Sequence, residues 1–206
     1  MISEDDICNF TKYTEQQLKK YAKNKLSFPD LEDYIKKQYC HDIYYCFLRS
    51  MIQIKKNYRG HGNECVIIDL DETFVQNYYF RHYTFHIWDH ITSVYDIHMK
   101  NAKRNFDPIL PFMFILYRYC LHKGIKVIFV SGRLEHLRKQ TIRHLKFSDV
   151  HEYELYLSQG SSMSEKTKII NQIQKKYTIL AVLNDQDDSP HPKLIKFPAL
   201  YIVSFS

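Results

Sequence analysis

The fold is decided by residues 65–73, CVIIDLDET, where a short apolar run leads directly into two aspartates. Three of the four apolar residues are β-branched, and such a run is typical of a strand buried on both faces of a parallel sheet. Asp69 and Asp71 then follow the carboxyl end of that strand. Because ligands of open parallel sheets bind beyond the carboxyl ends of the strands, this stretch predicts both the sheet and the edge where chemistry is expected.

Apolar runs alternate with helical patterns on the carboxyl side of this stretch. Further strands are expected at 125–130, 153–157, 178–183 and 200–203, and helices at about 111–123, 135–146 and 164–176. This alternation predicts an α/β fold, a Rossmann-like core with a parallel sheet between helices. The preceding residues show apolar side chains at helical spacing up to Gly60 and Gly62, so we expect an N-terminal helical extension, 1–62, before a core of 63–206.

Length and composition fit one globular domain with or without a short appendage. The 206 residues are 45% hydrophobic and 25% charged, which argues against disorder, and a net charge of +6 is small for a dedicated nucleic-acid-binding protein. The five cysteines include no C-x-x-C pair, so neither a zinc knuckle nor a disulfide framework is indicated. The first six residues are acidic where a signal peptide is basic, and the longest apolar-rich run, 109–121, is too short to span a bilayer. We therefore expect a soluble cytoplasmic protein with no signal peptide and no membrane contact.

Polar residues follow three of the expected strands and should converge at one edge of the sheet. They are Asp69 and Asp71, then Ser131-Gly132-Arg133, then Asn184 to Asp188, with Lys166 opening the helix before the last of these strands. An aspartate can attack phosphorus, crowded carboxylates can hold Mg²⁺, and a serine and a lysine can hold phosphate oxygens. The pattern favours phosphoryl transfer; the alternative is that these residues are helix caps and turn residues.

The run VIIDLDETFVQN, residues 66–77, contains the D-x-D-x-T pattern and resembles the haloacid dehalogenase (HAD) superfamily of phosphohydrolases. It is similar in particular to the class III (subfamily IIIB) acid phosphatase branch, which includes plant vegetative storage proteins. Other segments similar to that branch are 110–111, 116–117, 124–126, 131–133, 166–167 and 196–202. The resemblance covers roughly residues 60–206, with order and spacing preserved, whereas the N-terminal helices resemble the branch only loosely.

The resemblance implies a role for each residue of the expected site. Asp69 is the nucleophile and a Mg²⁺ ligand, and Asp71 is the general acid and base, with its backbone carbonyl on the metal. Thr73 positions the loop. Ser131 binds the phosphoryl group, Lys166 pairs with both phosphate and Asp69, and Asp185 completes the metal site. Substrate binding is expected from Ser131, Gly132, Arg133, Lys166 and Trp88, with Arg133 gripping phosphate oxygens in bidentate fashion.

The fourth motif departs from the family pattern, which usually has Gly-Asp followed by another acid three or four residues later. Asn184 replaces the glycine, and Ser189 stands at one of the two positions for the acid. Asp188, with Asp187 less favoured, is expected to supply the second carboxylate through water. Because Mg²⁺ commonly keeps several waters, we expect weakened rather than abolished metal binding. The alternative is a degenerate, non-catalytic site.

The insertion after the first motif, about 74–107, is short enough to predict a small cap and an open site. The aromatic residues of the insertion predict either a surface that stacks on a nucleobase or, as we favour, rings that pack beneath the insertion. These aromatic residues are Tyr78, Tyr79, Phe80, Tyr83, Phe85 and Trp88. His82, His86 and His90 are spaced four apart, but without further signature they are better explained as solvated or phosphate-facing than as zinc ligands. Basic side chains at 138, 139 and 143 are expected on the surface.

The sequence therefore predicts a Mg²⁺-dependent phosphomonoester hydrolase that acts through a phosphoaspartate on a small phosphomonoester such as a nucleotide. Two alternatives stay open. A nucleic-acid end phosphatase is suggested by the positive charge balance and the open site. A catalytically impaired storage or interaction protein with the same fold is suggested by the altered fourth motif. The pattern leaves the oligomeric state undetermined.

Overall fold

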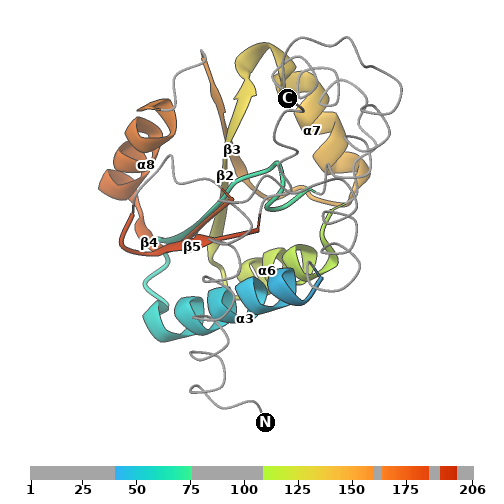
Figure 1. The fold of residues 1–206 in the computed structure, drawn as a ribbon. Helices are drawn as coiled ribbons and strands as arrows, with labels where there is room; N and C mark the ends of the chain where they lie inside the picture. Colours follow the sequence, from blue (N-terminus) through green and yellow to red (C-terminus); the bar gives the residue numbers. More distant parts are fainter. Residues whose placement is uncertain (1–39, 76–108, 160–163, 186–190, 199–206) are drawn as a thin grey trace, which may run out of the picture.

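The computed structural model describes residues 40–75, 109–159, 164–185 and 191–198, and Figure 1 shows the fold. Its elements are, in chain order, α3 (Cys40–Asn57), β1 (Glu64–Ile68), α6 (Pro111–His122), β2 (Lys126–Leu134), η2 (Glu135–Leu137), α7 (Arg138–Phe147), β3 (Glu154–Ser158), α8 (Ser164–Lys176), β4 (Thr178–Asn184) and β5 (Leu194–Lys196). The five strands pair in the order β3-β2-β1-β4-β5, and every pairing is parallel. The expected α/β fold with a parallel sheet between helices is confirmed.

The two faces of the sheet are covered by different helices, because alternate residues of each strand point to opposite sides. On one face, Val66 and Phe129 pack in a large core that includes residues of α3 and α6. On the other face, Ile67 and Ile128 pack against Ile170 of α8. Figure 1 shows α3 and α6 side by side and α8 on the opposite side of the sheet. Burial on both faces explains why the strands are apolar throughout.

Helix α3 belongs to the same packed core as the sheet. Ile43, Cys46 and Ile54 are buried in that core. Gln53 Nε2 donates hydrogen bonds to the carbonyls of Leu180, at 3.3 Å, and Lys193, at 2.8 Å, so the helix is tied to β4 and to the segment before β5. Residues 40–57 therefore contribute to the core, and the domain boundary at residue 62 stays a prediction.

Most of the expected elements agree with the structure within a residue or two. Strand β2 continues to Leu134, so Ser131, Gly132 and Arg133 lie within the last residues of the strand rather than after it. The pairing of β2 with β3 changes register between Ser131 and Leu134. The short strand β5 was not expected from the sequence. The strand expected at 200–203 and the insertion from residue 76 onward lie outside the described residues. No helix among the described residues is long and apolar enough to cross a membrane.

Candidate active site

The strand order reverses between β1 and β4, and an aspartate directly follows each of these two strands. From β1 the chain moves outward through β2 to β3, and it then returns to the other side of β1 with β4 and β5. A crevice beyond the carboxyl ends of the strands is expected where the order reverses, since the connections leave in opposite directions. Asp69 follows β1 and Asp185 follows β4 directly, and the backbone N–H of Asp69 donates to the carbonyl of Leu183 at 2.9 Å. Both acids therefore flank the point where this fold places a ligand.

The loop after β1 is a tight turn that is fixed by its own backbone. The N–H groups of Phe74 and Val75 both donate to the carbonyl of Leu70, at 2.9 and 2.7 Å. Glu72 adopts a left-handed φ of 59°, a conformation that non-glycine residues seldom take, so the turn is strained at this residue. The side chain of Thr73 is fully buried beside it. Such a loop holds Asp69 and Asp71 in a defined relation to the end of the strand.

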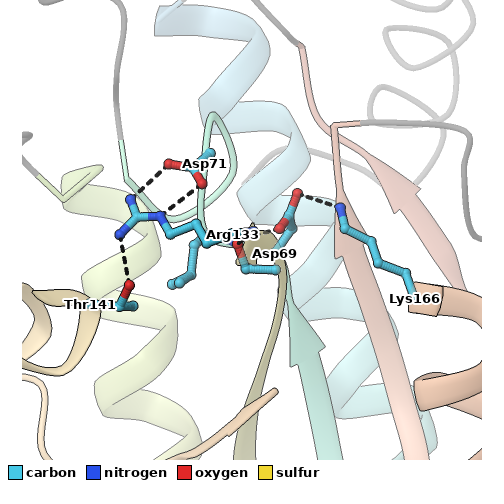
Figure 2. A network of polar contacts seen from close by, with 7 residues as sticks. Asp69, Asp71, Arg133, Thr141 and Lys166 are labelled. Carbon is cyan, nitrogen blue, oxygen red and sulfur yellow. Dashed lines mark hydrogen bonds and ion pairs between the residues drawn. The ribbon is translucent and has the colours of Figure 1, made fainter. Parts of the chain in front are cut away.

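Asp69 forms a buried ion pair with Lys166, the third residue of α8. Lys166 Nζ lies 3.0 Å from Asp69 Oδ2, and the two side chains are 9% and 6% exposed (Figure 2). The other oxygen, Oδ1, accepts the backbone N–H of Leu70 at 2.8 Å. Burial raises the pKa of Asp69, while the Lys166 ammonium and hydrogen bonding with Asp185 oppose that rise and the charge of Asp71 adds to it.

A contact between β3 and α8 fixes the position from which Lys166 reaches Asp69. Glu165, beside Lys166 in the first turn of α8, accepts hydrogen bonds from the hydroxyl of Ser158 and from the backbone N–H of Gln159. This joins the carboxyl end of β3 to the start of the helix. Gly132 lies next to the lysine stem, since a methyl group added at its Cα would come within 3.9 Å of Lys166 Cε.

Asp71 is held in a second ion pair, with Arg133 of β2. Arg133 Nε donates to Asp71 Oδ2 at 2.9 Å and Nη2 to Asp71 Oδ1 at 2.7 Å (Figure 2). The third nitrogen, Nη1, donates to the hydroxyl of Thr141 in α7 at 3.4 Å. Ser131 is buried, and its hydroxyl accepts the backbone N–H of Arg133 at 3.2 Å. The sequence-based expectation placed Arg133 on substrate phosphate, whereas in the structure its guanidinium lies on Asp71.

The acidic residues at this edge have the oxygen donors that a divalent metal ion prefers. Asp69 and Asp71 pair with Lys166 and Arg133, and Asp185, which is only 3% exposed, hydrogen-bonds with Asp69. In the described parts of the chain, no group of three or more His, Cys, Asp or Glu side chains is arranged to hold a metal ion. A divalent ion such as Mg²⁺ is commonly bound through only one or two carboxylates, with water and phosphate oxygens completing its shell, so Asp69 and Asp185 are the residues that would hold one here.

The structure thus brings together most of the residues that the sequence singled out. Asp69, Asp71, Ser131, Gly132, Arg133, Lys166 and Asp185 lie at one edge of the sheet, with Thr73 beneath the loop. Trp88, Asp188, Asp187 and the three spaced histidines lie outside the described residues, so their roles stay predictions. Sequence reasoning missed Thr141 and Glu165. Glu165 carried a signal, since an acid in the first turn of a helix is a common capping residue, whereas Thr141 carried none.

Comparison with known proteins identifies the family. The model of the HAD superfamily, subfamily IIIB (acid phosphatase), matches residues 3–198. A solved structure of the class C acid phosphatase from Bacillus anthracis is similar, with a TM-score of 0.70 at 14% sequence identity, over 83% of each chain. A structure of the class C acid phosphatase from the same organism with tungstate bound gives a TM-score of 0.67 at 15% identity, over 80% of each chain. No curated protein matches the sequence. The chain therefore belongs to the HAD superfamily, subfamily IIIB (acid phosphatase), and is a phosphatase.

Proposed function

We propose that this phosphatase hydrolyses small phosphomonoesters, such as nucleotides, through a phosphoaspartate on Asp69 and with Mg²⁺ bound beside it. The observation that carries the proposal is the buried Asp69–Lys166 pair, at 3.0 Å, where the strand order reverses. A nucleophilic carboxylate must approach a phosphate that is itself negative. Lys166, next to Asp69, supplies a positive charge for the phosphate oxygens at that point.

The reaction divides into two displacements. In the first, a carboxylate oxygen of Asp69 attacks phosphorus, the bond from phosphorus to the ester oxygen breaks, and Asp71 gives a proton to the leaving oxygen so that an alcohol departs. In the second, Asp71 takes a proton from water, the water oxygen attacks phosphorus, and inorganic phosphate leaves with Asp69 restored. The short spacing of Asp69 and Asp71 on one fixed turn supports this division of roles.

The metal would be held by Asp69 and Asp185, with the backbone carbonyl of Asp71 and, through water, Asp188. Phosphatases of this superfamily generally use a divalent metal ion. Bound Mg²⁺ would neutralise negative charge on the transferring phosphoryl group. Ser131 would donate its hydroxyl proton to a phosphate oxygen, and its burial at the end of β2 supports that role.

The first test compares the wild-type chain with Asp69→Asn on p-nitrophenyl phosphate, in Mg²⁺ and in EDTA. Asp149→Asn is a matched control, because Asp149 is 71% exposed and its left-handed φ of 60° suits asparagine. We expect wild type and the control to be equally active with Mg²⁺, and Asp69→Asn to lose a factor of about 10³ or more. Acid quenching during turnover should leave covalent phosphate on wild type and on the Asp149→Asn control but not on Asp69→Asn. Hydrolysis that survives in Asp69→Asn overturns the mechanism, and inactivity of the folded wild type favours the impaired storage or interaction protein.

A second candidate function, a nucleic-acid end phosphatase, is favoured by one surface beside the site. Helix α7 carries four Lys or Arg residues and no acid, and its buried Thr141 contacts Arg133. Lys139, Arg143 and Lys146 are exposed at helical spacing and form no ion pair with any described residue. If these three bind phosphates of a single strand, replacing them with glutamine should make the dependence of log kcat/KM on log salt shallower by about 2. Unchanged salt dependence on phosphorylated oligonucleotides would exclude this candidate.

A further inference from the structure

Arg133 grips Asp71 in a way that fixes both oxygens of the carboxylate. The two hydrogen bonds, at 2.9 and 2.7 Å, form the fork-to-fork contact in which a planar guanidinium matches a carboxylate. This contact sets the direction in which the carboxylate points, which a single charge contact would leave free.

The guanidinium itself is held by its surroundings. The Arg133 side chain is 4% exposed, whereas that of Asp71 is 19% exposed. The hydroxyl of Thr141 in α7 accepts a hydrogen bond from Arg133 Nη1, and the hydroxyl of Ser131 accepts a hydrogen bond from the backbone N–H of Arg133. The arginine is therefore the fixed partner of the pair, and Asp71, on the more open side, is the partner whose position depends on it.

We propose that Arg133, supported by Thr141, is a positioning residue that aims the Asp71 carboxyl group at the leaving oxygen of the substrate. The inference rests on the proposed function, in which Asp71 transfers the proton. Without the two-point contact, the Asp71 side chain can rotate, and its carboxyl proton then no longer points at the ester oxygen. Proton transfer in the transition state requires hydrogen-bond distance to that oxygen, so a misaimed acid loses its effect while the nucleophile stays in place.

This role and phosphate binding by Arg133 have different kinetic signatures. A residue that positions the acid matters most when the leaving group needs a proton. An alkyl phosphate releases a strongly basic alkoxide unless it is protonated, whereas p-nitrophenolate leaves unaided. A residue that binds the phosphoryl group acts on a part that all substrates share, so its loss affects every ester alike and raises KM.

The experiment measures kcat and KM of the full chain with Mg²⁺ on p-nitrophenyl phosphate, phenyl phosphate and an alkyl phosphate. Arg133→Lys keeps the charge but cannot make the bidentate contact, and Thr141→Val keeps the side-chain shape but removes the acceptor for Nη1. Arg118→Lys, at an exposed arginine of α6, is the matched control. For Arg133→Lys we expect kcat/KM on the alkyl ester to fall by about 100-fold, while kcat/KM on p-nitrophenyl phosphate changes little. The ratio kcat/KM reports the first displacement, whereas kcat also contains the second displacement, in which Asp71 acts as the base for every ester. Thr141→Val should show a smaller fall in the same order of substrates.

Two outcomes would overturn the inference. Equal losses of kcat/KM on all three esters with raised KM would assign Arg133 to phosphate binding, and equal losses of kcat/KM with unchanged KM in folded variants would leave it a structural role only. Circular dichroism and Tm establish folding, and Thr141→Val decides the matter if Arg133→Lys does not fold. Failure of the proposed function looks different, since wild type would then be inactive or Asp69→Asn would stay active. That result overturns both.

Discussion

Replacing Lys166 with methionine would leave the Asp69 carboxylate without the cation that faces it. The two charges are 3.0 Å apart, and less than a tenth of either side chain is exposed. Methionine keeps most of the length and volume of the lysine stem, so the change removes a charge with little loss of packing. The effect on stability therefore measures the ion pair rather than a cavity.

The structure allows the size of this effect to be worked out. At this separation, and with an effective dielectric constant of about 20, the attraction is about 5 kcal/mol. Desolvation of both groups offsets part of it, and removing one partner of a buried pair typically costs about 3–5 kcal/mol because the remaining charge is uncompensated. We expect Lys166→Met to lower the free energy of unfolding by about 3 kcal/mol at pH 7 in EDTA. In a chain of this length, that corresponds to roughly 6–12 °C in Tm.

The effect should also depend on pH. Burial raises the pKa of Asp69, and Lys166 is among the influences that oppose this rise. Without the ammonium, the pKa of the folded state rises further above that of the unfolded state, so the fold binds the Asp69 proton more tightly than the unfolded chain does. Stability gained by binding that proton is present at low pH and is lost as the pH rises through the folded-state pKa. The deficit of Lys166→Met relative to wild type should therefore be smaller near pH 4 than at pH 7.

Urea unfolding of a double-mutant cycle tests this reasoning directly. Asp69→Asn, Lys166→Met and the double variant are compared with wild type in EDTA, and we expect a coupling energy of about 2–3 kcal/mol. The control cycle uses Arg138→Met and Glu135→Gln, an ion pair whose side chains are 37% and 45% exposed, for which coupling of about 1 kcal/mol or less is expected. If the Asp69 and Lys166 changes add within about 0.5 kcal/mol, the buried pair does not stabilise the fold and the reasoning is refuted.

Three further predictions follow from other described residues. Asp185→Ala should raise the Mg²⁺ concentration for half-maximal hydrolysis by about 10-fold or more, and an unchanged Mg²⁺ dependence would remove Asp185 from the metal site. Burial alone would raise the pKa of Glu64, but hydrogen bonds from the N–H groups of His61, Arg59 and Gly62 bring this pKa below its ordinary value of 4.5. The ionised carboxylate therefore stabilises the fold above that pH, and this stabilisation is lost as the pH falls through the lowered pKa. Glu64→Gln should accordingly cost about 2 kcal/mol in urea unfolding at pH 7 and less near pH 3, whereas equal losses at both would contradict this. Burial raises the pKa of both Cys65 and Cys120 to about 12, so mass spectrometry should find neither alkylated by iodoacetamide in the native protein at pH 8.

The sheet and the residues at its edge could be predicted because they depend on local patterns. A run such as residues 179–183 is apolar throughout only when both faces of a strand are covered. The acid that follows β4 must then lie at the carboxyl end of the strand. Helix α8 begins at Ser164 and ends at Lys176, as its apolar spacing predicts. The likeness to the phosphatase family assigned roles to these positions, which spacing alone did not supply.

Features that depend on distant contacts could not be predicted in the same way. Arg133 and Asp71 are 62 residues apart, and their pairing depends on side-chain directions that no local pattern encodes. The buried side of α3 includes Cys46 and the polar Ser50, whereas the apolar Leu48 and Ile52 are only half-buried. Ser50 is accommodated because its hydroxyl donates to the carbonyl of Cys46. Strand β5 has only three residues, which is too few for a recognisable pattern.

The two aspartates of the turn receive different partners from different elements, and this separates their chemistry. Lys166 reaches Asp69 from α8, and Arg133 reaches Asp71 from β2. Asp69 is the more deeply buried and takes one ammonium, while Asp71 is more open and takes a bidentate guanidinium. Two carboxylates in different environments can take different roles, one in attack on phosphorus and one in proton transfer. In the proposed mechanism each role depends on one cation. Loss of Lys166 should therefore lower kcat/KM for every ester, and loss of Arg133 should lower kcat/KM mainly for esters with poor leaving groups.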